Sequence, residues 1–281
     1  MYMNKPVVSV IMAVYKENIT QIESAISGVL DQSYVDFEFI IVLDNPLNTP
    51  ALKKIRELSD GDGRVKIIQN IKNVGLGDSL NNALKVAKGK YISRMDADDE
   101  CHFSDKLAKQ INFLESNKNV DLLFTWWEEV SEDGRVVQRK PKRIYYKEIT
   151  KNFFTKSMML HPTMMVRREV FDSHLYPVMY RPEDLVLFLT LINEGYIFDV
   201  LEEVLYTYYT DRLDLHKRYG KIKIYAENFI PALFVSINNY WRNIYFWVYF
   251  GRLIAEFIVT RNFFIFRMTH RGFALIWKKI F

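Results

Sequence analysis

The sequence predicts an α/β fold with a mixed, mainly parallel sheet flanked by helices, followed by a helical extension rich in aromatic and basic residues. Three observations favour this fold class. Short β-branched apolar segments alternate with amphipathic segments along the first half of the chain, which is typical of βαβ units. Polar clusters follow three of the apolar segments, where ligands collect in parallel sheets. The composition changes near residue 215, which predicts a domain of residues 1–215 and a tail of residues 216–281.

The expected elements of the first half follow from the spacing of the apolar residues. Residues 7–14 form a nearly continuous β-branched segment, which is typical of a strand buried on both faces. Residues 19–30 instead place four apolar side chains at helical spacing. The same reasoning predicts further strands at 37–43, 65–68 and 91–95, and further helices at 51–58 and 76–87.

The second half of the predicted domain is less regular. Residues 158–166 form another apolar segment, and no internal repeat or low-complexity linker interrupts residues 1–215. One domain is therefore the simplest interpretation. We expect its remaining elements to be a helix over 103–117, a strand over 122–127, a hairpin turn at Gly134 and a helix over 183–194 that Gly195 ends.

Charge is distributed unevenly between the predicted domain and the tail. The segment from Leu215 carries eleven Lys and Arg against two Glu, whereas the rest carries twenty-seven against thirty-two Asp and Glu. Interfacial amphipathic helices facing anionic lipid fit such a tail, and helices packed on the domain are the alternative.

Cys101 is the only cysteine, which fits a reducing compartment. Residues 1–6 show no secretory signal, so we expect a cytoplasmic protein, peripheral on the inner face of the cell membrane.

Polar clusters follow three strands that are far apart in the sequence. Tyr15, Lys16 and Glu17 follow the first strand, Asp44 follows the second, and Asp96–Asp99 follow the fourth. The carboxyl ends of parallel strands share one edge of a sheet, where ligands bind. We therefore expect the three clusters to meet at one site.

The carboxylates of Asp96, Asp98 and Asp99 lie within four residues and repel one another unless a cation or a proton relieves them. Oxygen ligands at a strand end suit Mn²⁺ or Mg²⁺, which complete their coordination with phosphate oxygens and water. A solvated acidic loop is the alternative. The buried strand that precedes these residues favours a divalent metal site instead.

Six short motifs follow one another over residues 6–210: Val8–Tyr15, Asp44, Asn73–Gly77, Ser93–Asp99, His161–Thr163 and Glu183–Leu185. Their order and spacing resemble the inverting glycosyltransferases of family 2, which have the GT-A fold. Asp44–Leu47 and Arg94–Asp99 resemble, in detail, the branch that builds bacterial capsule, exopolysaccharide and lipopolysaccharide.

The resemblance implies roles for individual residues. Tyr15 would stack on the base, Asp44 would accept from a base N–H as in uracil, Asp96 would face the ribose or diphosphate, and Asp98 would hold the metal. Packing at Tyr15 and turn formation at Asp44 are the structural alternatives. The nucleoside pocket would comprise Ala13, Tyr15, Glu17 and Asp44, and further candidates for the site are Glu183, Asp99, Arg94, His161, Asp211 and Arg218.

A catalytic base is expected at the start of the helix over 183–194, where the helix dipole favours an ionised carboxylate. The resemblance places this base at Asp184, although Pro-Glu-Asp is also an ordinary first turn of a helix. The sequence departs from the wider family pattern in ways that weaken the assignment of a donor. These departures are Leu43, Leu80, Phe188, Thr190 and Asp211.

The predicted function is transfer of a sugar from a nucleotide sugar, with uridine donors expected, to a saccharide or lipid-linked saccharide in surface polysaccharide synthesis. The alternative is a non-enzymatic α/β protein that binds nucleotides or nucleic acid. We expect no nucleic-acid partner, because the front of the chain is acidic. The donor sugar, the acceptor hydroxyl and the oligomeric state stay open at this point.

Overall fold

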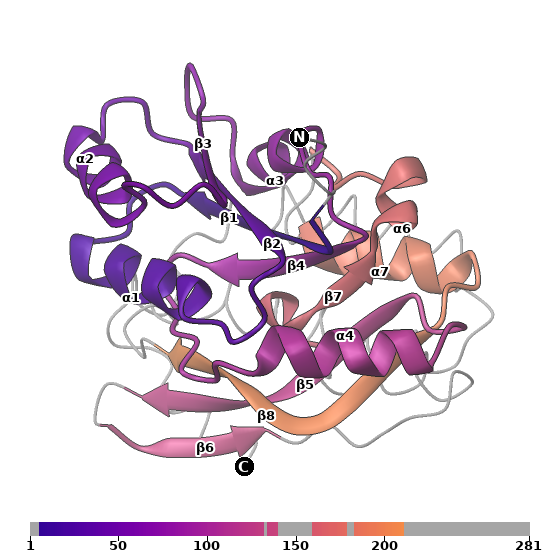
Figure 1. Cartoon of the computed structure of the whole chain (residues 1–281). Coiled ribbons are helices and arrows are strands. Elements are labelled where there is room, and N and C mark those ends of the chain that lie inside the picture. The colour runs from indigo at the N-terminus through magenta and orange to yellow at the C-terminus, as the bar shows by residue number, and fades with distance from the viewer. Residues whose placement is uncertain (1–5, 132–133, 140–158, 179–182, 211–281) are drawn as a thin grey trace, which may run out of the picture.

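A computed structural model describes residues 6–131, 134–139, 159–178 and 183–210. An eight-stranded sheet forms its centre, in the order β3-β2-β1-β4-β7-β5-β6, with β8 paired to β5 (Figure 1). The strands are β1 (Val8–Val14), β2 (Phe37–Leu43), β3 (Val65–Gln69), β4 (Tyr91–Asp96), β5 (Leu122–Ser131), β6 (Val136–Arg139), β7 (Met165–Arg167) and β8 (Phe198–Thr210). The helices are α1 (Ile19–Leu30), α2 (Thr49–Leu58), α3 (Leu76–Leu84), α4 (Lys106–Ser116), α6 (Arg168–Ser173) and α7 (Glu183–Asn193), with a 3₁₀ turn, η1, at His161–Thr163.

The first four strands are parallel, as the alternation of apolar segments predicts. β1 pairs in parallel with both β2 and β4, and β2 pairs in parallel with β3. The short strand β7 runs antiparallel between β4 and β5, which makes the sheet mixed. The predicted fold class, a mixed and mainly parallel sheet flanked by helices, is therefore confirmed.

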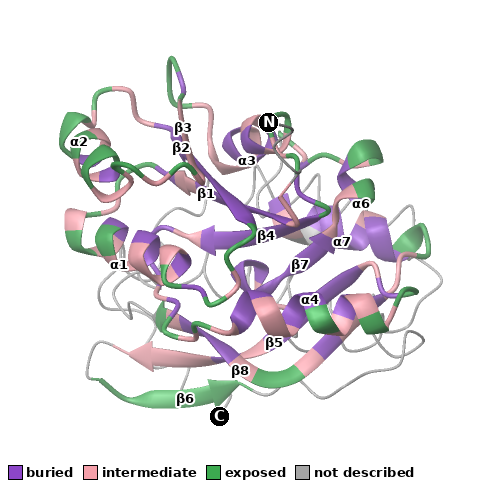
Figure 2. Ribbon diagram, in the orientation of Figure 1, coloured by how far each residue is buried: buried purple, intermediate pink, exposed green. Residues whose placement is uncertain are grey.

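Helices cover both faces of the sheet and give two apolar cores. Along β1, Val10 and Met12 face the core that α1, α2 and α4 complete, whereas Ile11 faces the core that α3, α6 and α7 complete. The central strands β1, β2 and β4 are buried, whereas the edge strand β6 is exposed and α1 and α2 expose their outer faces (Figure 2). This burial on both faces explains why β1 and β2 are mainly apolar in the sequence.

Side-chain contacts set two helix boundaries that differ from the sequence prediction. Helix α3 ends at Leu84 rather than residue 87, and Lys88 N next donates to Glu38 Oε1 (2.5 Å), which draws the chain toward the sheet. Helix α4 begins at Lys106 rather than residue 103, because Gln32 Oε1 accepts from Leu107 N (3.0 Å). Both boundaries depend on residues far away in sequence, which local periodicity does not contain.

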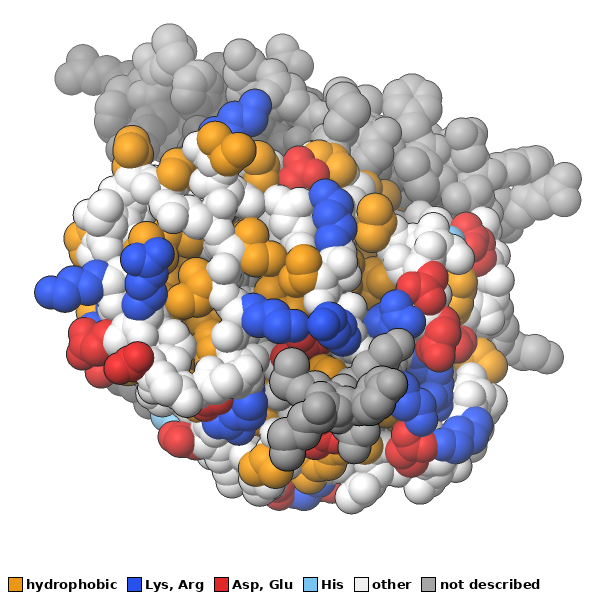
Figure 3. All heavy atoms as spheres, turned by 45° about the horizontal axis from the view of Figure 1, so that its top comes forward, with side chains coloured by type: hydrophobic (Ala, Val, Ile, Leu, Met, Phe, Trp, Pro, Cys, Tyr) orange, Lys and Arg blue, Asp and Glu red, His pale blue; other side chains and the backbone are white. Residues whose placement is uncertain are grey.

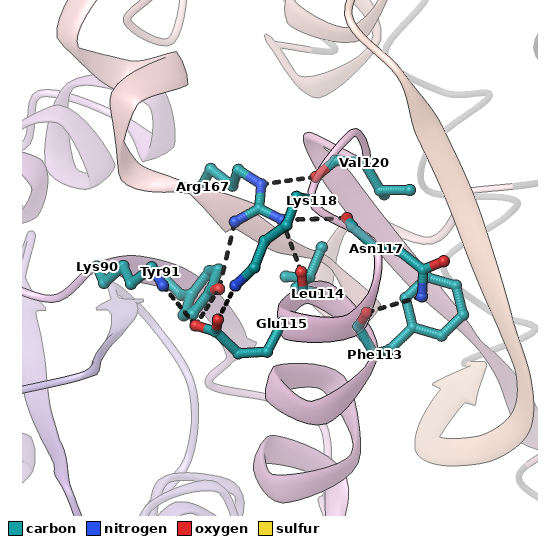
Figure 4. A network of polar contacts seen from close by, with 9 residues as sticks. All are labelled: Lys90, Tyr91, Phe113, Leu114, Glu115, Asn117, Lys118, Val120 and Arg167. Atoms are coloured by element: carbon teal, nitrogen blue, oxygen red, sulfur yellow. Dashed lines mark hydrogen bonds and ion pairs between the residues drawn. The ribbon is translucent and has the colours of Figure 1, made fainter.

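The last turn of α4 is fixed by the guanidinium of Arg167 on β7 (Figure 4). Its Nη2 donates to Leu114 O (2.7 Å) and Asn117 O (3.1 Å), and its Nε donates to Val120 O (2.8 Å). The last carbonyls of a helix have no partner within the helix, so these bonds satisfy them. Nη1 also donates to Tyr91 Oη (3.3 Å), which ties α4 to the start of β4.

The long strand β8 is missing from the sequence prediction. It pairs in parallel with β5 from Leu122↔Phe198 to Ser131↔Thr210, with register shifts beside Trp126. Such irregularities break the strict alternation by which strands are recognised.

Within the part of the chain that the structure describes, no helix has the length and apolar character needed to span a bilayer.

Candidate active site

Three polar segments meet where β1, β2 and β4 end. In the parallel pairs, Val14 lies beside Leu43 and Ala13 lies beside Asp96. Tyr15, Asp44 and the loop after Asp96 therefore leave the sheet at one edge. This arrangement agrees with the convergence expected from the sequence.

The turn after β1 is held by a side chain of its own. Glu17 Oε2 accepts from Tyr15 N (2.6 Å) and from Lys16 N (3.1 Å), and Asn45 Nδ2 donates to Tyr15 O (3.4 Å). The ring of Tyr15 stays 45% exposed beside this fixed backbone. An exposed aromatic ring on a rigid turn offers a face on which a planar base can stack. Ala13, at the end of β1, is partly buried.

Asp44 is buried and joins β2 to the start of α3. Its Oδ1 accepts from Val74 N (2.8 Å) and from Asn70 Nδ2 (2.9 Å), and its Oδ2 accepts from Gly75 N (2.8 Å). Gly75 caps α3 with a φ of 90°, a conformation in which a side chain would be strained. The Asn73–Gly77 motif thus has a structural reason, and Asn70 is a participant that the sequence analysis missed. A contact of Asp44 with a base N–H stays a prediction.

The three carboxylates of the loop after β4 form one compact group. Ligand oxygens of Asp96, Asp98 and Asp99 all lie within 4.8 Å of one another. Desolvation of the Asp98 carboxylate, then the charges of Asp96 and Glu17, raise its pKa to about 6, although the residue as a whole is exposed. Both causes disfavour the ionised form of Asp98, a cost that a bound cation would relieve, and the hard oxygen donors of the group fit a divalent cation such as Mn²⁺ or Mg²⁺.

Strand β8 is hydrogen-bonded to Asp99 of this loop. Tyr206 Oη donates to Asp99 Oδ2 (3.0 Å), and Tyr209 N donates to Asp99 Oδ1 (3.1 Å). Burial, then the charges of Asp96 and Asp98, raise the pKa of Asp99 well above its usual value. The sequence analysis missed both tyrosines, and the signal that could have found them is the aromatic cluster of residues 206–209.

Helix α1 packs directly against the segment that follows the carboxylates. A Cβ added to Gly28 would lie 2.8 Å from Cys101 O and 3.1 Å from Cys101 N. Any larger residue at position 28 would push the Cys101 backbone away from α1. The glycine therefore fixes the depth at which the loop lies over α1.

Arg94 places a positive charge beneath the carboxylate group. It is 2% exposed, and its Nη2 lies 2.5 Å from Asp96 Oδ1. Among the residues that the structure describes, its Nε and Nη1 have no hydrogen-bond partner. Burial disfavours the charged guanidinium, but the contact with Asp96 outweighs burial and raises the pKa of Arg94. The ion pair holds the Asp96 carboxylate at the end of β4.

Asp184 lies on the first turn of α7, as predicted, and faces His161 of η1. The distance between His161 Nδ1 and Asp184 Oδ2 is 4.0 Å, and the Asp184 side chain is 30% exposed. On the other side of the ring, His161 Nε2 lies 2.9 Å from Tyr176 Oη. Burial and the charge of Arg94 lower the pKa of His161 well below its usual value, so the ring is neutral.

Most of the candidate residues from the sequence lie in two connected groups. Glu183, also a candidate, is buried beside Gly77 at the start of α3. The first group is Ala13, Tyr15, Glu17, Asp44, Asp96, Asp98 and Asp99, and the second is Arg94, His161, Glu183 and Asp184. Arg94 joins the two, because it contacts Asp96 and acts electrostatically on His161. Asp211, Arg218 and the whole tail lie outside the described residues.

Comparisons with known proteins concern the family and the fold. Residues 9–175 match the model of the family described as glycosyl transferase family 2. A Methanocaldococcus jannaschii protein named uncharacterized glycosyltransferase MJ1057 is 36% identical over 95% of this chain and 93% of its own length. The Escherichia coli UDP-Glc:alpha-D-GlcNAc-diphosphoundecaprenol beta-1,3-glucosyltransferase WfgD is 29% identical over 69% of this chain and 73% of its own.

A solved structure with the same fold is the mannosyltransferase PcManGT of Pyrobaculum calidifontis, in complex with GDP-Man and Mn²⁺. Its TM-score is 0.63 at 16% identity, over 90% of this chain and 76% of that one. At this identity the likeness concerns the fold alone.

Proposed function

Because the chain belongs to glycosyl transferase family 2, we propose that it moves a sugar from a uridine diphosphate donor to a hydroxyl of a saccharide, with inversion at the anomeric carbon. Membership of an enzyme family sets aside the alternative of a non-enzymatic binding protein. On the face that Figure 3 shows, charged side chains of both signs lie among apolar ones.

The observation that supports this proposal most strongly is the link between the two carboxylate groups. Asp96 forms an ion pair with Arg94, the charge of Arg94 lowers the pKa of His161, and His161 faces Asp184. A displacement at a sugar carbon needs charge control at the leaving diphosphate and a base at the attacking hydroxyl. Two such groups on one buried scaffold fit that requirement.

On the donor side, the exposed ring of Tyr15 would stack on the base, and Asp96 would face the ribose or diphosphate. Asp44 would set the position of the Val74–Gly75 backbone beside the nucleoside and offer its remaining acceptor capacity to a base N–H. Asp98, with Asp99 and Asp96 nearby, would hold the divalent ion. When bound, that ion would offset the negative charge that develops on the diphosphate.

On the acceptor side, Asp184 would take the proton of the attacking hydroxyl. That oxygen forms a bond to the anomeric carbon while the bond from this carbon to the diphosphate oxygen breaks. One displacement with no covalent enzyme intermediate inverts the configuration of the anomeric carbon. A carboxylate on the first turn of a helix stays ionised more easily, which suits a base.

The acceptor is proposed from the relatives. WfgD is named for transfer to a diphosphoundecaprenol-linked sugar, so a lipid-linked saccharide acceptor at the cell membrane is a reasonable class for this chain. The basic tail would then bring the enzyme to anionic lipid. Flotation of the full chain with anionic and with zwitterionic liposomes tests this part, and equal flotation with both would contradict it.

The reaction itself is tested with a panel of nucleotide sugars and Mn²⁺, scoring thermal protection and slow donor hydrolysis. UDP-sugars are expected to protect the protein and to be hydrolysed. The variant Asp184→Asn should keep donor binding and lose transfer by about a hundredfold or more. Asp172→Asn, on the exposed side of α6, is the matched control and should behave as wild type. Protection by GDP-sugars alone would overturn the donor, and normal turnover of Asp184→Asn would overturn the base.

A further inference from the structure

The ring of His161 is enclosed between α7 and the segment after α6. It is buried, with Phe188 edge-on at 5.7 Å and Tyr176 at 5.4 Å between ring centroids. Its two nitrogens face different partners, Tyr176 Oη at 2.9 Å and Asp184 Oδ2 at 4.0 Å. The enclosed ring has little room to turn, so these two directions are fixed.

The neutral ring carries one proton, and the neighbouring groups decide where it resides. Burial raises the pKa of the Tyr176 phenol, which therefore keeps its proton. Among the described residues, His161 is the hydrogen-bond partner of this hydroxyl, so the phenol donates to Nε2. The proton of the ring is then on Nδ1, where it points at a carboxylate. The opposite tautomer would turn a lone pair toward Asp184 and would leave the buried phenol without an acceptor.

Tyr176 is itself held rigidly, although it lies in a loop. Asn81 of α3 is buried, and its Nδ2 donates to Tyr176 O (2.9 Å) while its Oδ1 accepts from Tyr176 N (2.9 Å). The start of α3 is bonded to Asp44 through Val74 and Gly75. A continuous set of contacts therefore runs from the proposed nucleoside side through α3 to Tyr176 and His161.

We propose that His161 and Tyr176 are positioning residues for Asp184: Tyr176 fixes the ring so that its Nδ1–H orients the Asp184 carboxylate toward the acceptor hydroxyl. This inference rests on the proposed function, because it takes Asp184 as the base. The distance of 4.0 Å is longer than a hydrogen bond, and contacts of this kind tighten when substrates bind. His161 would thus be a buried hydrogen-bond donor that orients the reacting carboxylate of Asp184 without touching the substrate.

The effect on the base has a defined direction. An N–H that points at a carboxylate stabilises its ionised form, so loss of that donor raises the pKa of the carboxyl group. The acidic limb of the kcat profile should therefore move to higher pH when the donor is removed. Other charged groups around Tyr176 are Arg94, Glu183 and Asp96, and the variants below leave them in place.

The test compares Tyr176→Phe with Tyr196→Phe. Tyr196 is a matched control, because its hydroxyl lies 3.5 Å from His174 Nδ1 in a Tyr–His pair whose histidine contacts Glu194 instead of a site carboxylate. Tyr176→Phe should lower kcat about ten- to a hundredfold and move the acidic limb upward, with donor KM and melting temperature close to wild type. Tyr196→Phe should change kcat less than about twofold.

A second pair of variants keeps the inference falsifiable if the ring region is sensitive to substitution. In His161→Asn an amide N–H can stand near the position of Nδ1, whereas His161→Leu removes both nitrogens. The Asn variant should therefore retain more kcat than the Leu variant. Wild-type kcat and pH profile in Tyr176→Phe would overturn the inference, as would a loss of kcat that only follows losses of donor affinity and melting temperature. Normal turnover of Asp184→Asn would instead overturn the proposed base.

Discussion

Replacing Asp44 by Asn separates its structural role from any contact with the nucleotide. The carboxylate accepts three hydrogen bonds while 3% exposed. An amide has one acceptor oxygen, so it can serve Val74 N and Asn70 Nδ2 but presents an NH₂ to Gly75 N. One charge-assisted bond is lost, at about 1.5–3 kcal/mol, and the other two become weaker neutral bonds.

We therefore expect Asp44→Asn to lower the free energy of unfolding by about 2–4 kcal/mol. Urea unfolding without nucleotide, followed by far-UV circular dichroism, measures this change. The control is Asp78→Asn, on the first turn of α3, which should lose only about 0.3–1 kcal/mol of dipole interaction. If both variants were equally stable, the proposed function of Asp44 as the anchor of α3 would be refuted, whatever happens to donor binding.

Three further predictions concern other parts of the molecule. Arg167→Ala should lower the free energy of unfolding by about 2–4 kcal/mol, because it leaves the last carbonyls of α4 without their donor. The control Arg168→Ala breaks an exposed ion pair and should cost less than about 1 kcal/mol. Equal losses of the two variants in urea unfolding would contradict the reasoning. Burial alone would raise the pKa of Glu38, but hydrogen bonds from Lys66, Ser9 and the Lys88 backbone lower it. The ionised Glu38 therefore stabilises the folded protein at pH values above the pKa of the unfolded state, and this stabilisation is lost as pH falls through the folded pKa. Glu38→Gln should therefore flatten the fall of melting temperature in acid, and an unchanged slope would refute this. Asp98→Asn should lose the thermal protection given by Mn²⁺ with UDP, while Asp105→Asn, nearby and half exposed, should keep it; protection in both would exclude Asp98 as a ligand.

The sequence allows the first half of the fold to be predicted because its strands are buried on both faces. β1 and β2 are mainly apolar, with one polar residue each, and β4 is equally buried although it contains Ser93 and Arg94. Polar residues lie at or directly after the end of each of these strands. The parallel register then brings those residues to one edge without further information. The convergence of Tyr15, Asp44 and Asp96–Asp99 at one edge of the sheet could be predicted in this way.

The other side of the site depends on contacts between residues far apart in sequence. Tyr206 reaches Asp99 across 107 positions, on a strand whose irregular register hides its period. Tyr176 and His161 are close in sequence, but the sequence does not show that the two side chains are buried together or that His161 faces Asp184 on α7. No local pattern of residue types carries such information. Resemblance could indicate His161, but it gave no reason for Tyr176.

The buried guanidinium of Arg94 exerts its charge on both groups of the candidate site, through Asp96 and His161. Dissolved ions weaken charges at the surface, but they reach a fully enclosed cation much less. Added salt should therefore weaken capture of the anionic donor from solution, while the field that Arg94 exerts on Asp96 and His161 stays nearly the same. In kinetic terms, donor KM should rise with ionic strength and the turnover of the bound complex should change little.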